Sequence, residues 1–247
     1  MSKEQKLDKQ IRELKQRIDS LRPLSRSELL ELKKWYLVTC TYHSNALEGN
    51  TLTLAETKVI VEDGLTVGGH PVKEILEAKN HKEVLEELFS IVQKKEDINE
   101  KLILRLHKIL IKGIDDENAG KYRQIQVYIT GEEEKPPLAK QVPELMKKLI
   151  QWYKKEKETM FVPELAARFH YRFVKIHPFV DGNGRIARFL ANLILMRAGY
   201  PLVIIPIVKR LDYINSLKSS SSEDKFVVFF KEIVVENMKD YLRMIKA

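Results

Sequence analysis

The sequence predicts an all-α protein, a bundle of helices that carries one small β-hairpin. Apolar residues recur at helical spacing through almost every long segment of the 247-residue chain. Capping boxes, in which a Ser or Thr is followed three residues later by Glu, precede two of these segments. Only one stretch, AGKYRQIQVYITGEEEKPP, shows the period-two alternation of a strand. We find neither an internal repeat nor a linker that would divide the chain into independent halves.

Residues 1–22 are expected to form a coiled-coil-like helix that Pro23 ends. Its apolar residues alternate at spacings of four and three, which is the a/d pattern: Leu7, Ile11, Leu14, Ile18 and Leu21. So few heptads do not form a stable isolated coiled coil. The helix therefore needs a partner, either the body of the protein or a second copy of the chain.

Residues 23–95 are expected to form a second helical region. Its first helix begins at a capping box made by Ser25 and Glu28. The helix runs toward the segment SNALEGN, where Gly49 can take the left-handed conformation that closes a helix.

A second capping box, Thr53 with Glu56, opens the next helix. That helix ends at Gly64, and the turn VGGHP follows it. A long amphipathic stretch then runs from Val72 to about Val92.

Residues 96–247 are expected to hold the remaining helices and the hairpin. The helical segments are 98–112, 142–157, 164–176, 185–198 and 226–245. The hairpin, or flap, is expected at about 121–136, because Ile125, Val127 and Ile129 alternate with polar neighbours.

The composition excludes several classes of protein. The formal charge is +8, but the lysines alternate with glutamates along helical patterns, which favours solvated helix faces over a nucleic-acid surface. The single cysteine, Cys40, allows no intrachain disulfide and lies in an apolar run, so a core position is expected rather than a nucleophile. No stretch has the length of a membrane span, and the N-terminus lacks a signal-peptide pattern. A cytoplasmic protein without membrane contact is expected.

One stretch, HPFVDGNGRIAR at residues 177–188, concentrates reactive side chains. Amphipathic segments on both sides predict a loop that leads into the N-terminus of a helix. Such an N-terminus presents unpaired N–H groups and partial positive charge, which suit phosphate. A plain turn between two helices is the alternative, since DGNG is a common turn sequence.

The combination of residues in this loop favours a polyphosphate site. Gly182 and Gly184 allow the backbone N–H groups to form an anion-binding nest. Arg185 and Arg188, three apart, share one face of the helix that starts there.

Two further side chains of the loop suit a transfer reaction. Asp181 can hold Mg²⁺, which often takes one or two protein carboxylates plus phosphate oxygens. His177 can be neutral near pH 7 and can accept a proton from an attacking hydroxyl.

The stretch also resembles the signature of Fic proteins, HxFxDGNGRxxR. Every fixed position of that signature is filled: His177, Phe179, Asp181, Gly182, Asn183, Gly184, Arg185 and Arg188. Most Fic proteins are protein adenylyltransferases (AMPylators), which move AMP from ATP onto a Ser, Thr or Tyr hydroxyl of a target protein. The resemblance covers most of residues 40–245 and implies a Fic-type bundle with its catalytic core in 96–247.

The resemblance implies a role for each residue of the loop. His177 would be the general base, and Asp181 would hold Mg²⁺, or alternatively Mn²⁺, against the α- and β-phosphates of ATP. The GNG nest would bind phosphate with Asn183 positioning it, and the two arginines would neutralise the β- and γ-phosphates. Phe179 would be buried and fix the loop.

Two other segments are similar to nucleotide-facing parts of Fic proteins. The stretch 121–136 looks like the family's flap, on which a target segment docks by main-chain pairing. Ile129, Thr130 and Gly131 would lie nearest the ATP. Tyr213 and Ile214 would lie near the adenine, although simple packing is an equal alternative for Tyr213.

A further motif, SNALEGN, places Ser44 and Glu48 on one helix face. It matches the inhibitory motif of many Fic proteins, [S/T]xxxE[G/N], with Gly49 in the last position. In such proteins the glutamate pairs with the second arginine of the signature, here Arg188, in place of the ATP γ-phosphate. A bidentate pair is expected.

These observations predict a self-inhibited adenylyltransferase that is a weak AMPylator, including of itself, until Glu48 moves. In some relatives the same glutamate serves removal of AMP, and the sequence does not separate the two directions. Transfer of another phosphate-containing group is one alternative. A nucleotide- or DNA-binding regulatory module is another, although nucleic acid is not expected as a partner. A homodimer formed through residues 1–22 remains open.

Overall fold

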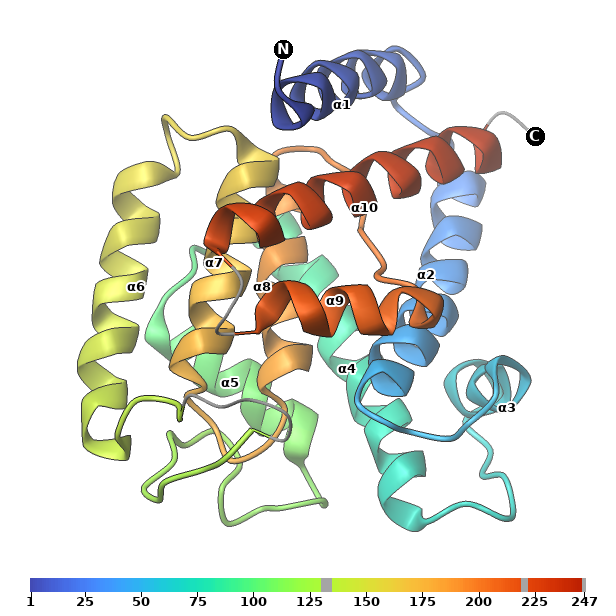
Figure 1. Cartoon of the computed structure of the whole chain (residues 1–247). Coiled ribbons are helices and arrows are strands. Elements are labelled where there is room, and N and C mark those ends of the chain that lie inside the picture. The colour runs from blue at the N-terminus through green and yellow to red at the C-terminus, as the bar shows by residue number, and fades with distance from the viewer. Residues whose placement is uncertain (130–134, 219–221, 246–247) are drawn as a thin grey trace.

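The computed structural model describes residues 1–129, 135–218 and 222–245, and all the regular secondary structure within them is helical (Figure 1). The α-helices are α1 (Lys3–Ser20), α2 (Arg26–Leu47), α3 (Leu54–Lys58), α4 (Val72–Lys94), α5 (Glu100–Ile111), α6 (Val142–Glu156), α7 (Val162–Ile176), α8 (Asn183–Arg197), α9 (Arg210–Leu217) and α10 (Glu223–Met244). One π-helical turn, Val59–Asp63, continues α3, and short 3₁₀ turns precede α6 and α9. The predicted all-α class is confirmed.

Local sequence signals determine where α2 begins and ends. The Ser25 hydroxyl accepts the Glu28 N–H, and the Glu28 carboxylate accepts the Ser25 N–H in return. At the other end Gly49 has φ +98, a conformation that L side chains rarely adopt. The capping box and the closing glycine therefore lie where the sequence predicts them.

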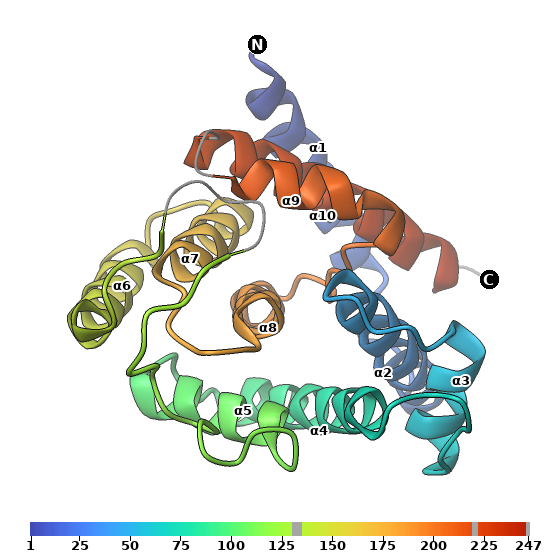
Figure 2. The ribbon, with the colours of Figure 1, turned by 60° about the horizontal axis from the view of Figure 1, so that its bottom comes forward.

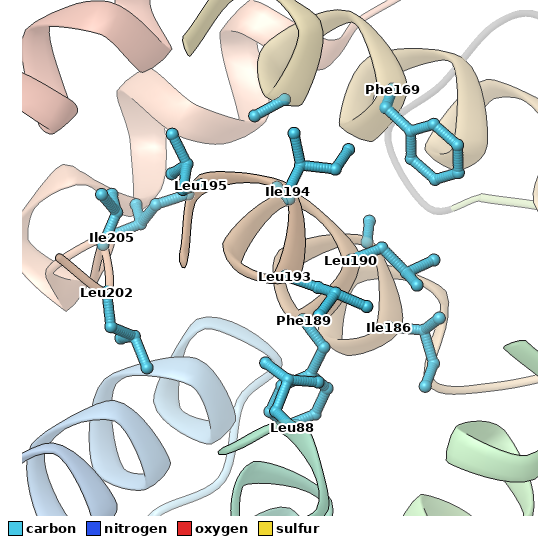
Figure 3. Packing of buried hydrophobic residues seen from close by; sticks show 14 of the residues in the cluster. Leu88, Phe169, Ile186, Phe189, Leu190, Leu193, Ile194, Leu195, Leu202 and Ile205 are labelled. Atoms are coloured by element: carbon cyan, nitrogen blue, oxygen red, sulfur yellow. The ribbon is translucent and has the colours of Figure 1, made fainter. Parts of the chain in front are cut away.

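Helix α8 lies at the centre of the molecule. Seen end-on in Figure 2, it is surrounded by α7, the α4–α5 pair, α2 and the α9–α10 layer. A helix buried on all sides is expected to be mostly apolar around its circumference, and the sequence ARFLANLILMR fits apart from Arg188 and Asn192, which are buried with hydrogen-bond partners. Phe189 of α8 and Leu88 of α4 belong to the same buried cluster, and Ile194 points toward α7 (Figure 3). The first turn of α8, which begins at Gly182, is thereby fixed by the core.

Helix α1 finds its partner within the same chain, because its apolar stripe packs against α10. Leu7, Ile11, Leu14 and Ile18 are buried, while Leu21 lies beyond the helix end and is exposed. The contact also contains Lys231 of α10, whose side chain is fully buried and lies 2.7 Å from carboxylates of both Glu4 and Asp8.

The predicted β-hairpin is not formed by the described residues of the flap. Side chains join its two arms instead of a backbone ladder, since Gln126 donates to the Pro136 carbonyl at 3.0 Å and Arg123 donates to the carbonyls of Ile125 and Pro137. Two consecutive prolines have no N–H to offer, which prevents regular strand pairing there.

Three further expectations concern two flap residues, membrane-spanning helices and Cys40. Thr130 and Gly131 lie outside the described residues. None of the described helices is long and apolar enough to cross a membrane. Cys40 is buried, as its apolar surroundings in the sequence predict.

Candidate active site

The loop between α7 and α8 brings a histidine to the N-terminus of a buried helix. His177 ends α7 with φ +50, and the following proline prevents the helix from continuing. Gly182 takes φ +80 and becomes the N-cap of α8. A Cβ at Gly182 would lie 3.2 Å from side-chain atoms of Leu110 and Ile111, so the position is constrained by packing as well as by conformation.

The middle of the loop is fixed by a reciprocal pair of hydrogen bonds. The Phe179 N–H donates to Asn183 Oδ1, and Asn183 Nδ2 donates to the Phe179 carbonyl, both at 2.9 Å. Phe179 is fully buried and stacks on His107, with ring centroids 3.6 Å apart. Because both polar atoms of the Asn183 side chain are used inside the loop, its backbone N–H is the part left to face a ligand.

His107, which the sequence reading did not single out, anchors the same loop from α5. Its Nδ1 accepts the Gly120 N–H at 3.0 Å, so its Nε2 carries the proton and donates to the Asp181 carbonyl at 3.1 Å. Burial lowers the pKa of His107 to about 4, which keeps this arrangement neutral and intact at pH 7.

His177 is neutral at the pH of most cells. Burial lowers its pKa to about 4, the Val174 carbonyl acts in the opposite direction, and the nearby charge of Arg123 lowers it further. Arg123 is itself buried, and its Nε donates to the His177 carbonyl at 2.7 Å. A neutral imidazole beside a cleft has the protonation state that a general base needs.

Asp181 and Arg185 form an ion pair at the N-terminus of α8. Asp181 Oδ1 accepts the Gly182 N–H at 2.6 Å and lies 3.1 Å from the Arg185 guanidinium, while Oδ2 lies 3.7 Å from Lys73. Burial acts to raise the pKa of Asp181, but the charge of Arg185 and the Gly182 N–H outweigh it, so the pKa is lowered. The carboxylate is therefore ionised, and its Oδ2 is the better placed of its oxygens for a cation.

Glu77 of α4 is a second partner of Arg185. The Arg185 side chain is 1% exposed, and its NH1 lies 3.2 Å from Glu77 Oε1. Glu77 Oε2 also accepts a hydrogen bond from Asn50 at 2.9 Å. Glu77 therefore connects the loop 177–188 to the segment that follows Glu48. The sequence carries no signal for this link, since Glu77 is one of many glutamates on an amphipathic helix.

Arg188 is held by the end of α2. Its Nε donates to the Ser44 hydroxyl at 3.0 Å, and its NH2 donates to the Ser44 carbonyl at 2.8 Å and to Glu48 Oε1 at 2.7 Å. Its NH1 donates to the Tyr213 hydroxyl at 3.2 Å. The bidentate pair expected for Glu48 is not formed, because Ser44 and Tyr213 occupy the other donors of the guanidinium.

The Glu48 carboxylate also lies against the backbone of the loop. A Cβ built at Gly184 would overlap a Glu48 carboxylate oxygen and would lie 3.1 Å from Arg188 NH1. Because Gly184 has no side chain, the Glu48 carboxylate can lie against the N-terminal turn of α8.

Tyr213 extends the hydrogen bonds of Arg188 into the protein interior. It is 5% exposed, and its hydroxyl lies 3.0 Å from His170 Nε2. Because Tyr213 accepts a hydrogen bond from Arg188, its own proton is directed at His170, whose pKa burial lowers to about 3. A chain of polar contacts therefore runs from Glu48 through Arg188 and Tyr213 to His170.

A cleft of about 830 Å³ opens over these residues. Its walls bring together side chains from α2, the flap, α6, α7, α8 and α9: Leu47, Glu48, Ile129, Pro136, Leu145, Val174, His177, Gly184, Arg210, Tyr213, Ile214 and Leu217 among others. Ile129, Tyr213 and Ile214 thus lie in the same cleft as His177. No cluster of three or more metal-binding side chains is found in the described part of the chain.

The fold and this loop define a class of protein. A model of the Fic/DOC family matches residues 97–195. A Fic domain containing signaling protein from Bacteroides thetaiotaomicron is 31% identical, with a TM-score of 0.86 over 96% of this chain and 98% of that one. The chain belongs to the Fic family.

Two other relatives are similar over most of this chain. Fic-1 from C. elegans is 30% identical, with a TM-score of 0.87 over 98% of this chain and 73% of that one. Protein adenylyltransferase Fic from Drosophila melanogaster is 37% identical over 221 residues, which are 88% of this chain and 44% of the relative. The chain therefore spans less than half of that relative's length.

Proposed function

We propose that this chain is a self-inhibited protein adenylyltransferase that transfers AMP from ATP to a Ser, Thr or Tyr hydroxyl of a protein. The observation that carries the proposal is the neutral His177 at the edge of a cleft whose floor is the N-terminus of α8, with Glu48 seated on Arg188. The likeness to a relative named protein adenylyltransferase supports it.

In the proposed reaction the N-terminal turn of α8 binds the phosphates of ATP. Its free N–H groups and partial positive charge face the cleft, and Arg188 supplies a full charge once Glu48 has left. Mg²⁺, held by Asp181, would neutralise phosphate charge. Asp181 suits this role because it is ionised and about half exposed.

His177 is proposed to accept the proton of the attacking hydroxyl. The hydroxyl oxygen forms a bond to the α-phosphorus, the bond from that phosphorus to the bridging oxygen breaks, and pyrophosphate leaves. The chain's contribution is mostly positioning and charge stabilisation, as in phosphoryl transfer generally. The flap would hold the target segment beside His177, and Ile129 and Ile214 would contact the nucleotide from the cleft walls.

The group that is transferred identifies the reaction. The Glu48→Gly variant is incubated with ATP labelled at the α-phosphate and, separately, at the γ-phosphate. Transfer of AMP places only the α-label on protein, and mass spectrometry of the product identifies the modified hydroxyl. His177→Ala is the matched control and should carry neither label. Incorporation of the γ-label would assign the chain to phosphate transfer instead.

A further inference from the structure

A second groove adjoins the cleft and has no carboxylate among the residues that line it. This groove, of about 360 Å³, lies between α6 and α7 and shares Leu145 and Lys175 with the cleft. The two helices lie side by side at one edge of the molecule (Figure 2). Lys148 and Trp152 of α6 and Arg172 of α7 line the groove but not the cleft.

The groove has a net positive charge that the described residues only partly neutralise. Arg172 is paired with Glu223 at 2.9 Å and lies over the Trp152 ring at 4.0 Å. Lys175 lies 5.5 Å from the centre of the Tyr171 ring, and neither Lys175 nor Lys148 has a carboxylate within ion-pair distance anywhere in the described residues. Glu48 is the sole carboxylate on the described walls of the adjoining cleft.

We infer that this groove, defined by Lys148, Trp152, Arg172 and Lys175, binds an acidic stretch of the target protein next to the hydroxyl that is modified. The inference rests on the proposed function, since a protein segment must lie beside His177 for its hydroxyl to react. The groove adjoins the cleft that is lined by His177, and its positive charge is complementary to Asp and Glu side chains.

The geometry indicates where the acidic residues would stand in the target. Tyr171 lies six positions before His177 in the chain, which is about 9 Å along a helix. An extended segment covers that distance in about three residues. Acidic side chains two to four positions from the modified hydroxyl would therefore reach the lysines, while an apolar side chain there would pack on Trp152.

Paired peptides test this selectivity. Each pair of short synthetic peptides has one central hydroxyl residue and carries either Glu or Gln at the flanking positions two to four residues away. The Glu48→Gly variant should modify the Glu peptide with a kcat/KM at least about fivefold higher, because two partly exposed ion pairs contribute about 0.5 kcal/mol each. About 0.5 M NaCl should remove most of the preference.

The ratio between the two peptides separates a docking role from a structural one. In the Lys148→Gln/Lys175→Gln double variant the ratio should fall to about one, whatever happens to the overall rate. Lys147→Gln/Lys154→Gln is the matched control, because both lysines are exposed on α6 outside the groove, and this variant should keep the ratio. Equal kcat/KM values for the Glu and Gln peptides in the parent would overturn the inference.

Two other occupants of the groove give distinguishable results. Displacement of a bound Glu peptide by a mixed-sequence DNA oligonucleotide that binds more tightly would assign the groove to nucleic acid. The chain's own acidic run at 132–134 is the other candidate, and a tenfold gain in peptide affinity on replacing that run with Gln would assign the groove to it. Auto-AMPylation of the Glu48→Gly variant is followed in parallel. Its absence would contradict the proposed function, whereas its presence without acid selectivity would contradict only this inference.

Discussion

Glu48 and Gly184 lie in contact at the active-site cleft, and a Cβ at position 184 would displace the Glu48 carboxylate. The same carboxylate accepts a hydrogen bond from Arg188 at 2.7 Å. It therefore lies between the N-terminal turn of α8 and the guanidinium, where a phosphate would gain from both. Glu48 thus lies between a helix N-terminus and an arginine, two groups that favour a negative charge.

Removal of this carboxylate should activate the chain. A hydrogen bond between charged groups contributes about 1.5–3 kcal/mol, so Glu48→Gly should raise the initial rate of auto-AMPylation about tenfold to 100-fold. Label incorporation from α-labelled ATP measures the rate. Glu48→Gln is the matched variant, because it keeps the shape and removes the charge, and it should fall between the two. Equal rates with and without Glu48 would contradict the inhibitory role.

A methyl group at position 184 should reveal the contact in the stability of the protein. Gly184 does not have the left-handed conformation, so alanine is acceptable to the backbone and meets mainly Glu48 and Arg188. Gly184→Ala should lower the free energy of unfolding by about 1–3 kcal/mol in the parent and by clearly less in Glu48→Gly.

Urea denaturation of the four proteins in this cycle measures the coupling between positions 48 and 184. Gly68→Ala is the control, because nothing lies within 4 Å of its Cβ position, and its effect should be the same in both backgrounds. Equal costs of Gly184→Ala in both backgrounds would show that the two residues do not interact.

Most of this site follows from the sequence, because its residues are adjacent in the chain and have a long specific pattern. The capping boxes, the buried stripe of α1 and the loop 177–188 are each predicted by residues that lie close together in the sequence. The partners that hold the loop, His107, Arg123 and Glu77, come from distant segments. Helical periodicity predicts that such residues face the protein interior, but it does not predict which groups they contact.

In the flap, by contrast, the local sequence pattern predicts a hairpin that the described residues do not form. The alternation of Ile125, Val127 and Ile129 is a valid strand pattern, but a strand also needs a partner with backbone donors. The described part of the returning arm contains two consecutive prolines, and Arg123 donates hydrogen bonds to carbonyls of both arms. Tertiary hydrogen bonds therefore decide this segment against its local pattern.

Glu77 is expected to position Arg185 for ATP. Glu77→Gln keeps a group that can accept a hydrogen bond from Asn50 but removes the charge that faces the Arg185 guanidinium. In the Glu48→Gly background this change should raise KM for ATP about tenfold, which corresponds to about 1.4 kcal/mol, with a smaller change in kcat. Steady-state rates over a range of ATP concentrations give both constants.

Glu74→Gln is the matched control for this measurement. Glu74 also lies on α4 and binds the segment after Glu48, through Thr51, but has no contact with Arg185 among the described residues. Its KM for ATP should stay within about twofold of the parent. A similar rise in KM for both variants would show that Glu77 acts through α4 as a whole.

The acid limb of activity should lie well below the usual range for histidine. The pKa of His177 in the folded protein is lowered to about 4, so the neutral form persists at pH 5 and is lost only as the pH falls through about 4. The profile of kcat/KM against pH reports this group in the free enzyme. A midpoint near 6.5 would show that the imidazole is not buried as the structure has it.

The lowered pKa values of the buried histidines also limit the pH range in which the profile of kcat/KM can be measured. The unfolded chain binds a proton at each buried histidine near pH 6.5, whereas the folded chain binds it near pH 4 at His107 and His177. Stability is therefore lost as the pH falls from 6.5 toward 4. Circular dichroism at each pH separates loss of the fold from titration of the base.

Lys231 should control the attachment of α1. Its side chain is fully buried, and it lies 2.7 Å from Glu4 and Asp8 of α1 and 3.6 Å from Glu164 of α7. Lys231→Met leaves these carboxylates facing one another without a cation, which should cost about 3 kcal/mol. Separation of α1 from α10 relieves part of this cost. The amides of α1 should therefore exchange with solvent much faster.

Lys3→Met provides the comparison, because Lys3 pairs with Glu232 across the same two helices but at the surface. An exposed pair contributes at most about 1 kcal/mol, so exchange in α1 should change little. Hydrogen exchange read by mass spectrometry measures both variants on peptides from α1 and from the α7–α8 loop. Faster exchange confined to α1 in Lys231→Met would show that the buried cation holds the helix. Equal exchange in the two variants would mean that the apolar stripe of α1 alone is sufficient.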